Sequence, residues 1–332
     1  MNARPSSRAE RIALPPSMQG TITVSVDVED WHQLVGRKLS GRLPACSPHV
    51  EDQTARLLDV LDERGVRGTF FVLGLVARER PHLVKRIAER GHEIASHGVQ
   101  HVPLHRLEPS AVRADLRDSR ALLSDLVGRD VAGFRAPEFS IVEENDWVLE
   151  EVAAAGYRYD SSIYPITHRR YGIPSFPRGP SRLVLGDKHL WELPLGTLAT
   201  GIGNVPIGGG GSFRLFPSAV LERAIRSVTA HGGHVMLYFH PYEFTHTRLS
   251  VERRELPSDI AARMRARTWL ALQAMGRSRL PSRARRAIGL ARAVRAIDLV
   301  DELDRRPASA APSPTVGSVE PAAARRTHDV RN

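Results

Sequence analysis

The feature that most constrains the fold is a repeated unit in which a short apolar segment precedes a polar loop and a helical segment. Apolar segments rich in β-branched or aromatic residues lie at 21–26, 68–73, 92–95, 131–134 and 235–239. Between them apolar residues recur at helical spacing, and helical segments stop at glycines such as Gly65 and Gly91. Strands that alternate with helices are typical of parallel sheets, because a parallel crossover has room for a helix. The sequence therefore predicts an α/β fold with parallel strands.

The segment 164–216 interrupts this repeat. It is rich in proline and glycine and contains the run Gly208–Gly211. We expect long loops there around a single strand, Leu190–Leu193, and loops of this length often shape a substrate cleft. The glycine run lacks the Lys-Ser/Thr of a phosphate-binding loop, and no helix is expected to begin there. We interpret it as a flexible loop of the cleft.

Polar side chains stand at the ends of the predicted strands. The carboxyl ends of parallel strands converge on one face, so we expect these side chains to share a cleft. They are Asp27, Glu29, Asp30, His97, His101, Arg135, Asp160 and His240.

The pair His97 and His101 is the strongest indication of a metal site. Imidazole is a common ligand of divalent metals, but the chain has 14 histidines, so the spacing alone is weak support. Gly98 and Pro103 predict that the pair lies in a loop that leaves a strand, and not on one helical face. In that position both rings would be directed at the cleft.

Five ordered motifs resemble those of the polysaccharide deacetylase family, especially the branch associated with bacterial exopolysaccharide loci. The resemblance covers about residues 20 to 245. It implies a distorted β/α barrel of about seven parallel strands, and metal-dependent removal of N-acetyl groups from the amino sugars of a glycan. The motifs are DVEDW at 27–31, HEIASHGVQH at 92–101, FRAPEFS at 134–140, YDSS at 159–162 and YFHP at 238–241.

The resemblance assigns His97 and His101 as metal ligands and an acid after the first strand as the third ligand. Many family members have two adjacent aspartates at that point, whereas this chain separates its acids. Strand alternation puts Asp27 and Glu29 on the same face, so we favour Asp27 as the general base and Glu29 as the ligand. Asp30 is the alternative ligand. We expect Zn²⁺, with Co²⁺, Mn²⁺ or Fe²⁺ as alternatives.

The same resemblance gives roles to three further residues. His240 would be the general acid, Asp160 the partner that keeps it charged, and Arg135 the residue that orients or tunes the base. Taken singly, each could equally be structural. Gly98 departs from the Ser or Thr that is common in the family, so a supporting hydrogen bond would have to come from elsewhere. Water activated by the metal would attack the amide while Asp27 accepts its proton.

Three residues beside these motifs could contact a sugar. Tyr242 and Trp191 have rings that can stack on sugar faces, and Glu138 borders the arginine motif. Trp191 also suits the core, because it follows Leu190 in an apolar segment.

Two other functions remain open. Separated acids also occur in unusual family members, so hydrolysis of a small cyclic amide or imide is one alternative. The other is a non-catalytic module that binds an anionic ligand. The net charge is +10, and residues 251–332 hold 17 basic residues against 9 acidic ones. The arginines of 263–286 lie among apolar residues, as in an amphipathic helix that contacts a membrane surface or an anionic glycan, although a solvated helical face has the same pattern. We expect no nucleic-acid partner.

These patterns divide the chain into a disordered leader at 1–20, a catalytic domain at 21–250, an Arg-rich helical extension at 251–303 and a disordered tail at 304–332. The single cysteine, Cys46, excludes an intramolecular disulfide. The first twenty residues hold charges and two adjacent prolines where a signal peptide needs an apolar stretch. We expect a cytoplasmic protein, or one peripheral to the inner membrane.

Overall fold

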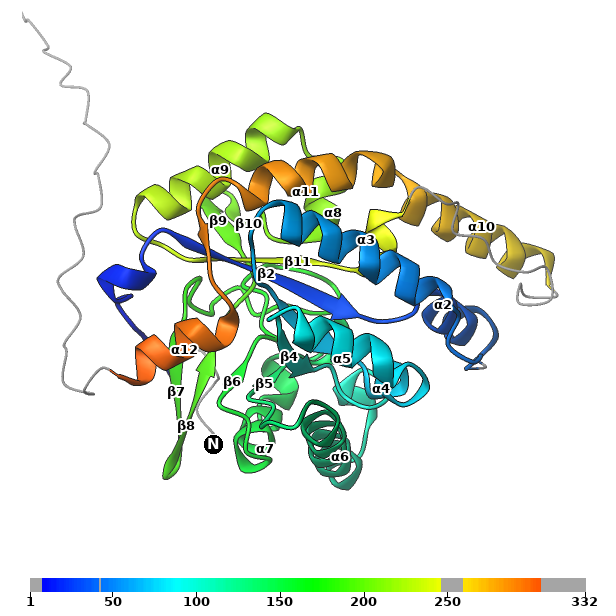
Figure 1. The fold of residues 1–332 in the computed structure, drawn as a ribbon, viewed down its shortest axis with the longest axis horizontal. Coiled ribbons are helices and arrows are strands. Elements are labelled where there is room, and N and C mark those ends of the chain that lie inside the picture. Colours follow the sequence, from blue (N-terminus) through cyan, green and yellow to red (C-terminus); the bar gives the residue numbers. More distant parts are fainter. Residues whose placement is uncertain (1–7, 42, 246–258, 306–332) are drawn as a thin grey trace, which may run out of the picture.

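A computed structural model describes residues 8–41, 43–245 and 259–305, and its centre is an array of seven parallel strands with helices outside it (Figure 1). The predicted α/β fold with parallel strands is confirmed. Across the array the strands are β8 (Lys188–Glu192), β6 (Tyr159–Asp160), β5 (Gly133–Phe134), β4 (Glu93–Ser96), β3 (Thr69–Val72), β2 (Thr21–Val28) and β11 (Val235–Phe239).

The two ends of this array approach each other. The chain that leaves β8 makes an isolated parallel pairing between Leu195 and Met236 of β11, and Gly196 donates a hydrogen bond to the Met236 carbonyl. A second isolated pairing joins Gly209 to Tyr238. The array therefore curves round on itself as an irregular barrel.

Strand β2 lies between β3 and β11, and all eight of its residues are buried. Burial on both faces is expected of a strand with parallel neighbours and explains its nearly continuous apolar sequence. Its carboxyl end delivers Asp27 and Glu29 to one face of the barrel, as the strand alternation predicts.

The outer helices form where the sequence has an apolar face. In α5 (Pro81–Glu89), proline occupies the first turn, and Leu83, Val84 and Ile87 are fully buried. The other helices are α2 (Trp31–Ser40), α3 (His49–Glu63), α4 (Gly74–Glu79), α6 (Pro109–Val127), α7 (Val148–Ala154), α8 (Gly210–Leu215), α9 (Ser218–Ala230), α10 (Ile260–Ala274), α11 (Leu280–Ile288) and α12 (Ala296–Asp304). Within the described ranges, none of the helices is both long enough and apolar enough to cross a membrane.

The expectation of a disordered leader is wrong for residues 8–20. Strand β1 (Ala9–Arg11) pairs antiparallel with β7 (Ser181–Leu185), and Leu14 and Met18 are buried. Its partner strand is far along the chain and β1 is mostly exposed, so local sequence gave no indication of the pairing. Residues 1–7 lie outside the described residues.

The C-terminal boundary is also different from the predicted one. Strand β12 (Arg292–Ala293) pairs with the start of β2, and α12 buries Leu299, Val300 and Leu303. The Ala296 amide donates to the Thr69 hydroxyl at the start of β3. Residues 292–304 thus cover the amino ends of the strands as part of the barrel. The predicted tail lies outside the described residues from residue 306.

The segment 164–216 holds more regular structure than expected. Strands β7 and β8 form a hairpin that turns at Gly186, where φ is +65°. Strands β9 (Thr197–Thr200) and β10 (Gly203–Pro206) form a second hairpin, and α8 begins at Gly210, where no helix was expected. Seven of the eight residues in the second hairpin's strands are half-buried or exposed, so these strands lack the apolar alternation by which strands are recognised.

Several arginines of the Arg-rich segment hold α11 on the barrel. Arg283 donates to the main-chain carbonyls of Phe213 and Phe216, 2.6 and 2.8 Å away. Arg285 pairs with Glu63, and Arg286 with Glu222. These three side chains bind other parts of the protein. Their positions therefore do not support the expected contact of this segment with a membrane or a glycan.

If α12 is part of the fold, truncating its buried face should destabilise the whole protein. Leu299 is 0% exposed, so Leu299→Ala should lower the free energy of unfolding by roughly 2–5 kcal/mol in urea titrations. Leu272→Ala is the matched control, because Leu272 is a helical leucine with 55% exposure and its loss should change stability by less than about 0.5 kcal/mol. Equal effects of the two substitutions would contradict the inclusion of α12 in the folded domain.

Buried His92 should make stability depend on pH. Its Nδ1 accepts a hydrogen bond from the Gly68 amide, and burial, aided by Arg67, lowers its pKa to about 4. Below pH 6.5 the unfolded chain gains a proton that the folded chain does not. Stability should therefore fall between pH 6.5 and 4, by up to roughly 3 kcal/mol from this residue. His92→Gln keeps a hydrogen-bond acceptor but does not titrate. The free energy of unfolding of this variant should therefore fall less than that of the parent as the pH is lowered. If the two free energies fall in parallel with pH, His92 is not the cause.

Candidate active site

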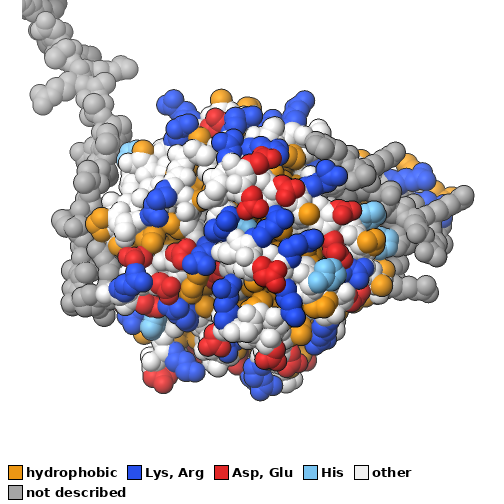
Figure 2. Space-filling model, in the orientation of Figure 1, with side chains coloured by type: hydrophobic (Ala, Val, Ile, Leu, Met, Phe, Trp, Pro, Cys, Tyr) orange, Lys and Arg blue, Asp and Glu red, His pale blue; other side chains and the backbone are white. Residues whose placement is uncertain are grey.

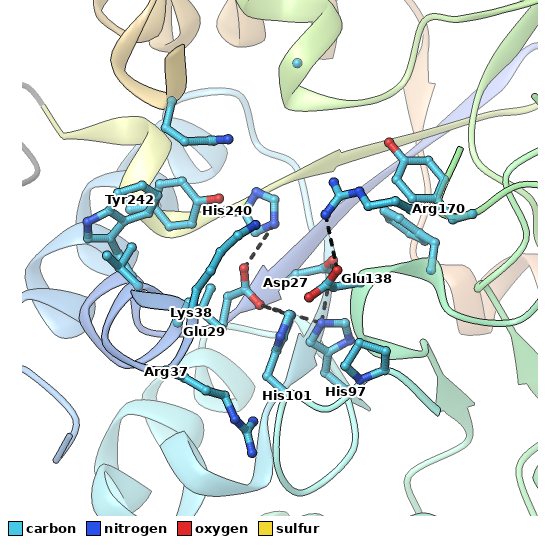
Figure 3. Close-up of a pocket in the computed structure, with 18 of the residues that line it drawn as sticks. Asp27, Glu29, Arg37, Lys38, His97, His101, Glu138, Arg170, His240 and Tyr242 are labelled. Carbon is cyan, nitrogen blue, oxygen red and sulfur yellow. Dashed lines mark hydrogen bonds and ion pairs between the residues drawn. The ribbon is translucent and has the colours of Figure 1, made fainter. Parts of the chain in front are cut away.

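A cleft of about 1030 Å³ opens at the carboxyl ends of the parallel strands. Most of the predicted site residues come together in it (Figure 3). Asp27 and Glu29 arrive from β2, His97 and His101 from the loop after β4, and His240 from the end of β11.

Three of these side chains form a group that could hold a metal ion. One ligand atom from each of Glu29, His97 and His101 lies within 4.8 Å of the others. The Glu29 Oε2 atom is 2.8 Å from His101 Nε2 and 3.8 Å from His97 Nε2. One carboxylate oxygen and two imidazole nitrogens are a donor set that Zn²⁺ accepts, as do several other divalent ions.

The protonation of His97 and Glu29 suits metal binding, whereas Glu29 outweighs the effect of burial and raises the pKa of His101. His97 Nδ1 lies 2.8 Å from the Arg135 carbonyl, which can only accept, so Nδ1 is the donor. Burial lowers the pKa of His97, so its Nε2 lone pair is available on the side of Glu29. Burial opposes ionisation of Glu29, but His101, His240 and His97 lower its pKa to about 2. Glu29 is therefore a carboxylate at neutral pH.

The loop between the two histidines explains the departure at Gly98. Its φ is +76°, and a Cβ atom there would lie 2.7 Å from Asp115 Oδ2. Asp115 accepts a hydrogen bond from the Val99 amide at 3.0 Å, and Ser96 accepts one from the Gly98 amide at 3.2 Å. Ser96 and Asp115 thus supply side-chain hydrogen bonds to this loop in the absence of a Ser or Thr at position 98.

Glu29 and Asp30 have different surroundings, which distinguish their roles. Asp30 caps α2 by accepting a hydrogen bond from the His32 amide, and its carboxylate accepts two more from the amide and hydroxyl of Ser47, at 2.6 and 2.8 Å. This carboxylate holds a neighbouring loop and is not in the group of three. Of the two predicted alternatives for the third ligand, the geometry favours Glu29.

Asp27 and Arg135 meet as expected. Arg135 is fully buried and donates from Nη1 to Asp27 Oδ1 at 2.7 Å and to the Ser25 hydroxyl at 2.9 Å. Its Nε donates to the Ser161 carbonyl. The other oxygen of Asp27 lies 3.9 Å from His97 Nε2, so this carboxylate borders the candidate metal site.

The partner of His240 is Glu243, which was not among the predicted site residues. His240 Nδ1 lies 3.4 Å from Glu243 Oε2, and the same oxygen accepts the His240 amide at 3.0 Å. His240 Nε2 lies 3.2 Å from Glu29 Oε1. Burial disfavours a charged ring, but Glu29 and Glu243 raise the pKa of His240 to about 9. A glutamate three residues after a strand-end residue is a capping-box pattern, and this signal could have identified it.

Asp160 lies in another environment from the one predicted. Its carboxylate accepts hydrogen bonds from the Ser162 hydroxyl and amide at 2.7 and 3.0 Å. It also lies beside Glu192, whose pKa burial and Asp160 raise well above the usual value. The contacts of Asp160 are thus with Ser162 and Glu192, so the prediction that Asp160 is the partner of His240 is corrected.

The glycine run has a structural role at this point. A Cβ atom on Gly210 would lie 2.2 and 2.3 Å from the two carboxylate oxygens of Glu243. Only glycine allows α8 to start this close to Glu243. The run is thus a helix start that accommodates the partner of His240, where we had expected a flexible loop.

Two of the three candidate sugar contacts line the cleft. These are Tyr242, whose ring stacks on His240 with centroids 4.8 Å apart, and Glu138. Trp191 instead packs against α12 and donates to Asp304, so it belongs to the core.

Comparison with known proteins identifies the domain. The family model "Polysaccharide deacetylase" matches residues 45–159. The chain contains a polysaccharide deacetylase domain. A second family model, "Domain of unknown function (DUF3473)", matches residues 161–282. The deacetylase model therefore includes the histidine pair, while His240 lies in the segment of unknown function.

Curated relatives match part of this deacetylase domain. A chitooligosaccharide deacetylase of Bradyrhizobium sp. (strain ANU 289) is 40% identical over 85 residues, which is 25% of this chain and 36% of the relative. A peptidoglycan-N-acetylglucosamine deacetylase of Bacillus cereus is 33% identical over 99 residues, 30% of this chain and 36% of the relative. The chain thus spans about a third of the length of these relatives.

A solved structure shares the fold over most of the chain. The probable polysaccharide deacetylase from Pseudomonas aeruginosa PAO1 has a TM-score of 0.56 at 16% identity, with coverage of 87% of this chain and 93% of that one. This similarity supports the barrel fold of the deacetylase domain.

The assignment of Glu29 can be tested against its neighbour. The purified protein should bind about one divalent ion per chain. Glu29→Gln removes the carboxylate from the group of three and should weaken Zn²⁺ binding at least roughly tenfold in competition titrations. Asp30→Asn is the matched control and should retain Zn²⁺, even if the loop at Ser47 loses stability. The assignment fails if Asp30→Asn loses the metal and Glu29→Gln keeps it.

Proposed function

We propose that this protein is a metal-dependent hydrolase that removes N-acetyl groups from the amino sugars of a glycan. The observation that carries the proposal is the group of Glu29, His97 and His101 beside Asp27 in one cleft, to which the segment matched by the polysaccharide deacetylase model contributes both histidines. The matched relatives are named as deacetylases of chitooligosaccharide and peptidoglycan.

A metal held by Glu29, His97 and His101 would polarise the amide carbonyl and make water more acidic. The fit rests on the donor set and on Glu29 Oε2, a buried oxygen that lies 2.8 Å from His101 Nε2 and 3.8 Å from His97 Nε2. Zn²⁺ is our first choice, and Co²⁺, Mn²⁺ or Fe²⁺ would suit the same ligands.

Asp27 is the proposed general base. Arg135 holds one of its oxygens at 2.7 Å, which fixes the orientation of the carboxylate. The second oxygen faces the His97 side of the cleft, where it can accept a proton from water as the water attacks the amide carbon. Arg135 is a positioning residue in this scheme, because it acts through Asp27.

His240 is the proposed general acid. An amine is a poor leaving group until it is protonated, and His240 carries a proton at neutral pH because Glu29 and Glu243 stabilise its charged form. The stacked Tyr242 ring restricts the orientation of the imidazole. Base and acid are then different side chains, each with its own buried partner.

The alternatives have less support. The names of the matched relatives favour a glycan over a small cyclic amide. A non-catalytic binding module would not require a buried base, a charged histidine and three converging ligand atoms in one cleft. Origin in an exopolysaccharide locus and a cytoplasmic location stay predictions from the sequence.

The function predicts acetate release from N-acetylated oligosaccharides by the Zn²⁺-loaded protein. Asp27→Asn should lower kcat roughly 10²- to 10⁴-fold while the protein keeps its metal. Asp187→Asn, an exposed aspartate in the turn after β7, is the matched control and should behave as the parent. Full activity in Asp27→Asn would contradict the assignment of the base. Hydrolysis of small cyclic amides without acetate release would favour the alternative substrate.

A further inference from the structure

The outer part of the cleft is strongly cationic. Arg214 lies 3.8 Å from Glu243. The other five Lys and Arg side chains of the cleft line this outer part, and we call them the basic rim. They come from α2, from the short helix η2 (Leu104–Arg106) and from the loop before Tyr171. Figure 3 labels three of them around the candidate metal site. The basic rim consists of Arg37, Lys38, Arg106, Arg169 and Arg170.

The carboxylates of the cleft do not neutralise this rim. Asp27 pairs with Arg135, Glu29 contacts three imidazoles, and Glu243 lies beside His240. Of the described acids that line the cleft, Glu138 is left to face the rim, and it lies 3.5 Å from Arg170. One carboxylate against five cations leaves an excess of positive charge.

Like charges in the rim repel one another. Burial, Arg170 and Arg106 all lower the pKa of Lys38. Among the residues that the structure describes, no carboxylate oxygen lies within 4.0 Å of a side-chain nitrogen of Lys38, Arg106 or Arg169. An anion bound between these side chains would relieve the repulsion.

This charge excess is local. On the face of the molecule in Figure 2, basic and acidic side chains are interspersed. In the Arg-rich segment, Arg285 and Arg286 pair with glutamates. The rim instead gathers exposed cations around the opening of the cleft, where a substrate must enter.

We infer that the glycan substrate is anionic, with a carboxylate or phosphate group close to the acetamido sugar that the basic rim binds. This inference rests on the proposed function. The acetamido group must reach the centre of the cleft beside Asp27 and Glu29, whereas the basic rim lines the outer part. The negative group must therefore lie on a neighbouring unit. Guanidinium groups suit it because they donate two parallel hydrogen bonds to carboxylate or phosphate oxygens.

Binding to Zn²⁺-loaded Asp27→Asn protein tests the inference without turnover. The probes are a hexasaccharide of alternating N-acetylglucosamine and glucuronate, neutral chitohexaose, and UDP-N-acetylglucosamine as a diphosphate. At low salt we expect an anionic probe to bind at least roughly tenfold tighter than chitohexaose, and the advantage should shrink as salt screens the rim. Preference for the glucuronate probe would assign a carboxylate, and preference for UDP-N-acetylglucosamine a phosphate. Equal or tighter binding of chitohexaose would overturn the inference.

A double substitution locates the anion site. In the same background, Arg106→Gln with Arg169→Gln should abolish most of the preference for the anionic probe and change chitohexaose binding less than about twofold. Arg223→Gln with Arg226→Gln is the matched control, because both arginines are exposed on α9 and neither lines the cleft. An unchanged preference in the rim variant would overturn the inference.

Activity of the parent protein separates this inference from the proposed function. No acetate from any glycan, neutral or anionic, would contradict the function itself. Acetate release with equal kcat/KM on chitohexaose and the glucuronate hexasaccharide would leave the function standing and contradict an anionic substrate.

Discussion

The interaction on which the site depends is the fully buried ion pair between Arg135 and Asp27, 2.7 Å apart. A guanidinium away from water needs its hydrogen bonds satisfied, and Ser25 and Ser161 accept most of the remaining ones. The Arg135 carbonyl also accepts the Nδ1 proton of His97. One residue after β5 therefore orients both the candidate base and a candidate metal ligand, and it connects β2 with the segment that follows β6.

The cleft separates two electrostatic environments around this pair. At its centre, the Glu29 carboxylate is surrounded by the imidazoles of His97, His101 and His240. At its edge lies the basic rim, with Glu138 between the two. Glu138 and the next residue, Phe139, have left-handed backbones with φ of 56° and 53°, a conformation that costs non-glycine residues free energy and is found most often at functional sites. This backbone conformation holds the Glu138 carboxylate between the imidazoles around Glu29 and the basic rim.

Sequence patterns predicted the parts of this site that depend on strand periodicity. Alternation along β2 puts Asp27 and Glu29 on one face, and parallel strands bring the histidine pair to the same end. The choice between Glu29 and Asp30 needed the contacts of Asp30 with Ser47. The partner of His240 could not be predicted from strand periodicity, because Glu243 lies past the end of β11 in the short helix Pro241–Phe244. Its environment depends on how closely Gly210 lets α8 approach. The strands β1 and β12 were missed because they are short and mostly polar, and their partners are distant in sequence.

The central claim is that Glu29, His97 and His101 bind one divalent metal. X-ray absorption spectroscopy at the zinc edge of the Zn²⁺-loaded protein tests it most directly. We expect two imidazole ligands, and oxygen ligands that complete the shell, at metal–ligand distances of about 2.0–2.2 Å. In the His101→Ala variant we expect one imidazole ligand. A shell without imidazole, or one that is unchanged in that variant, would contradict it.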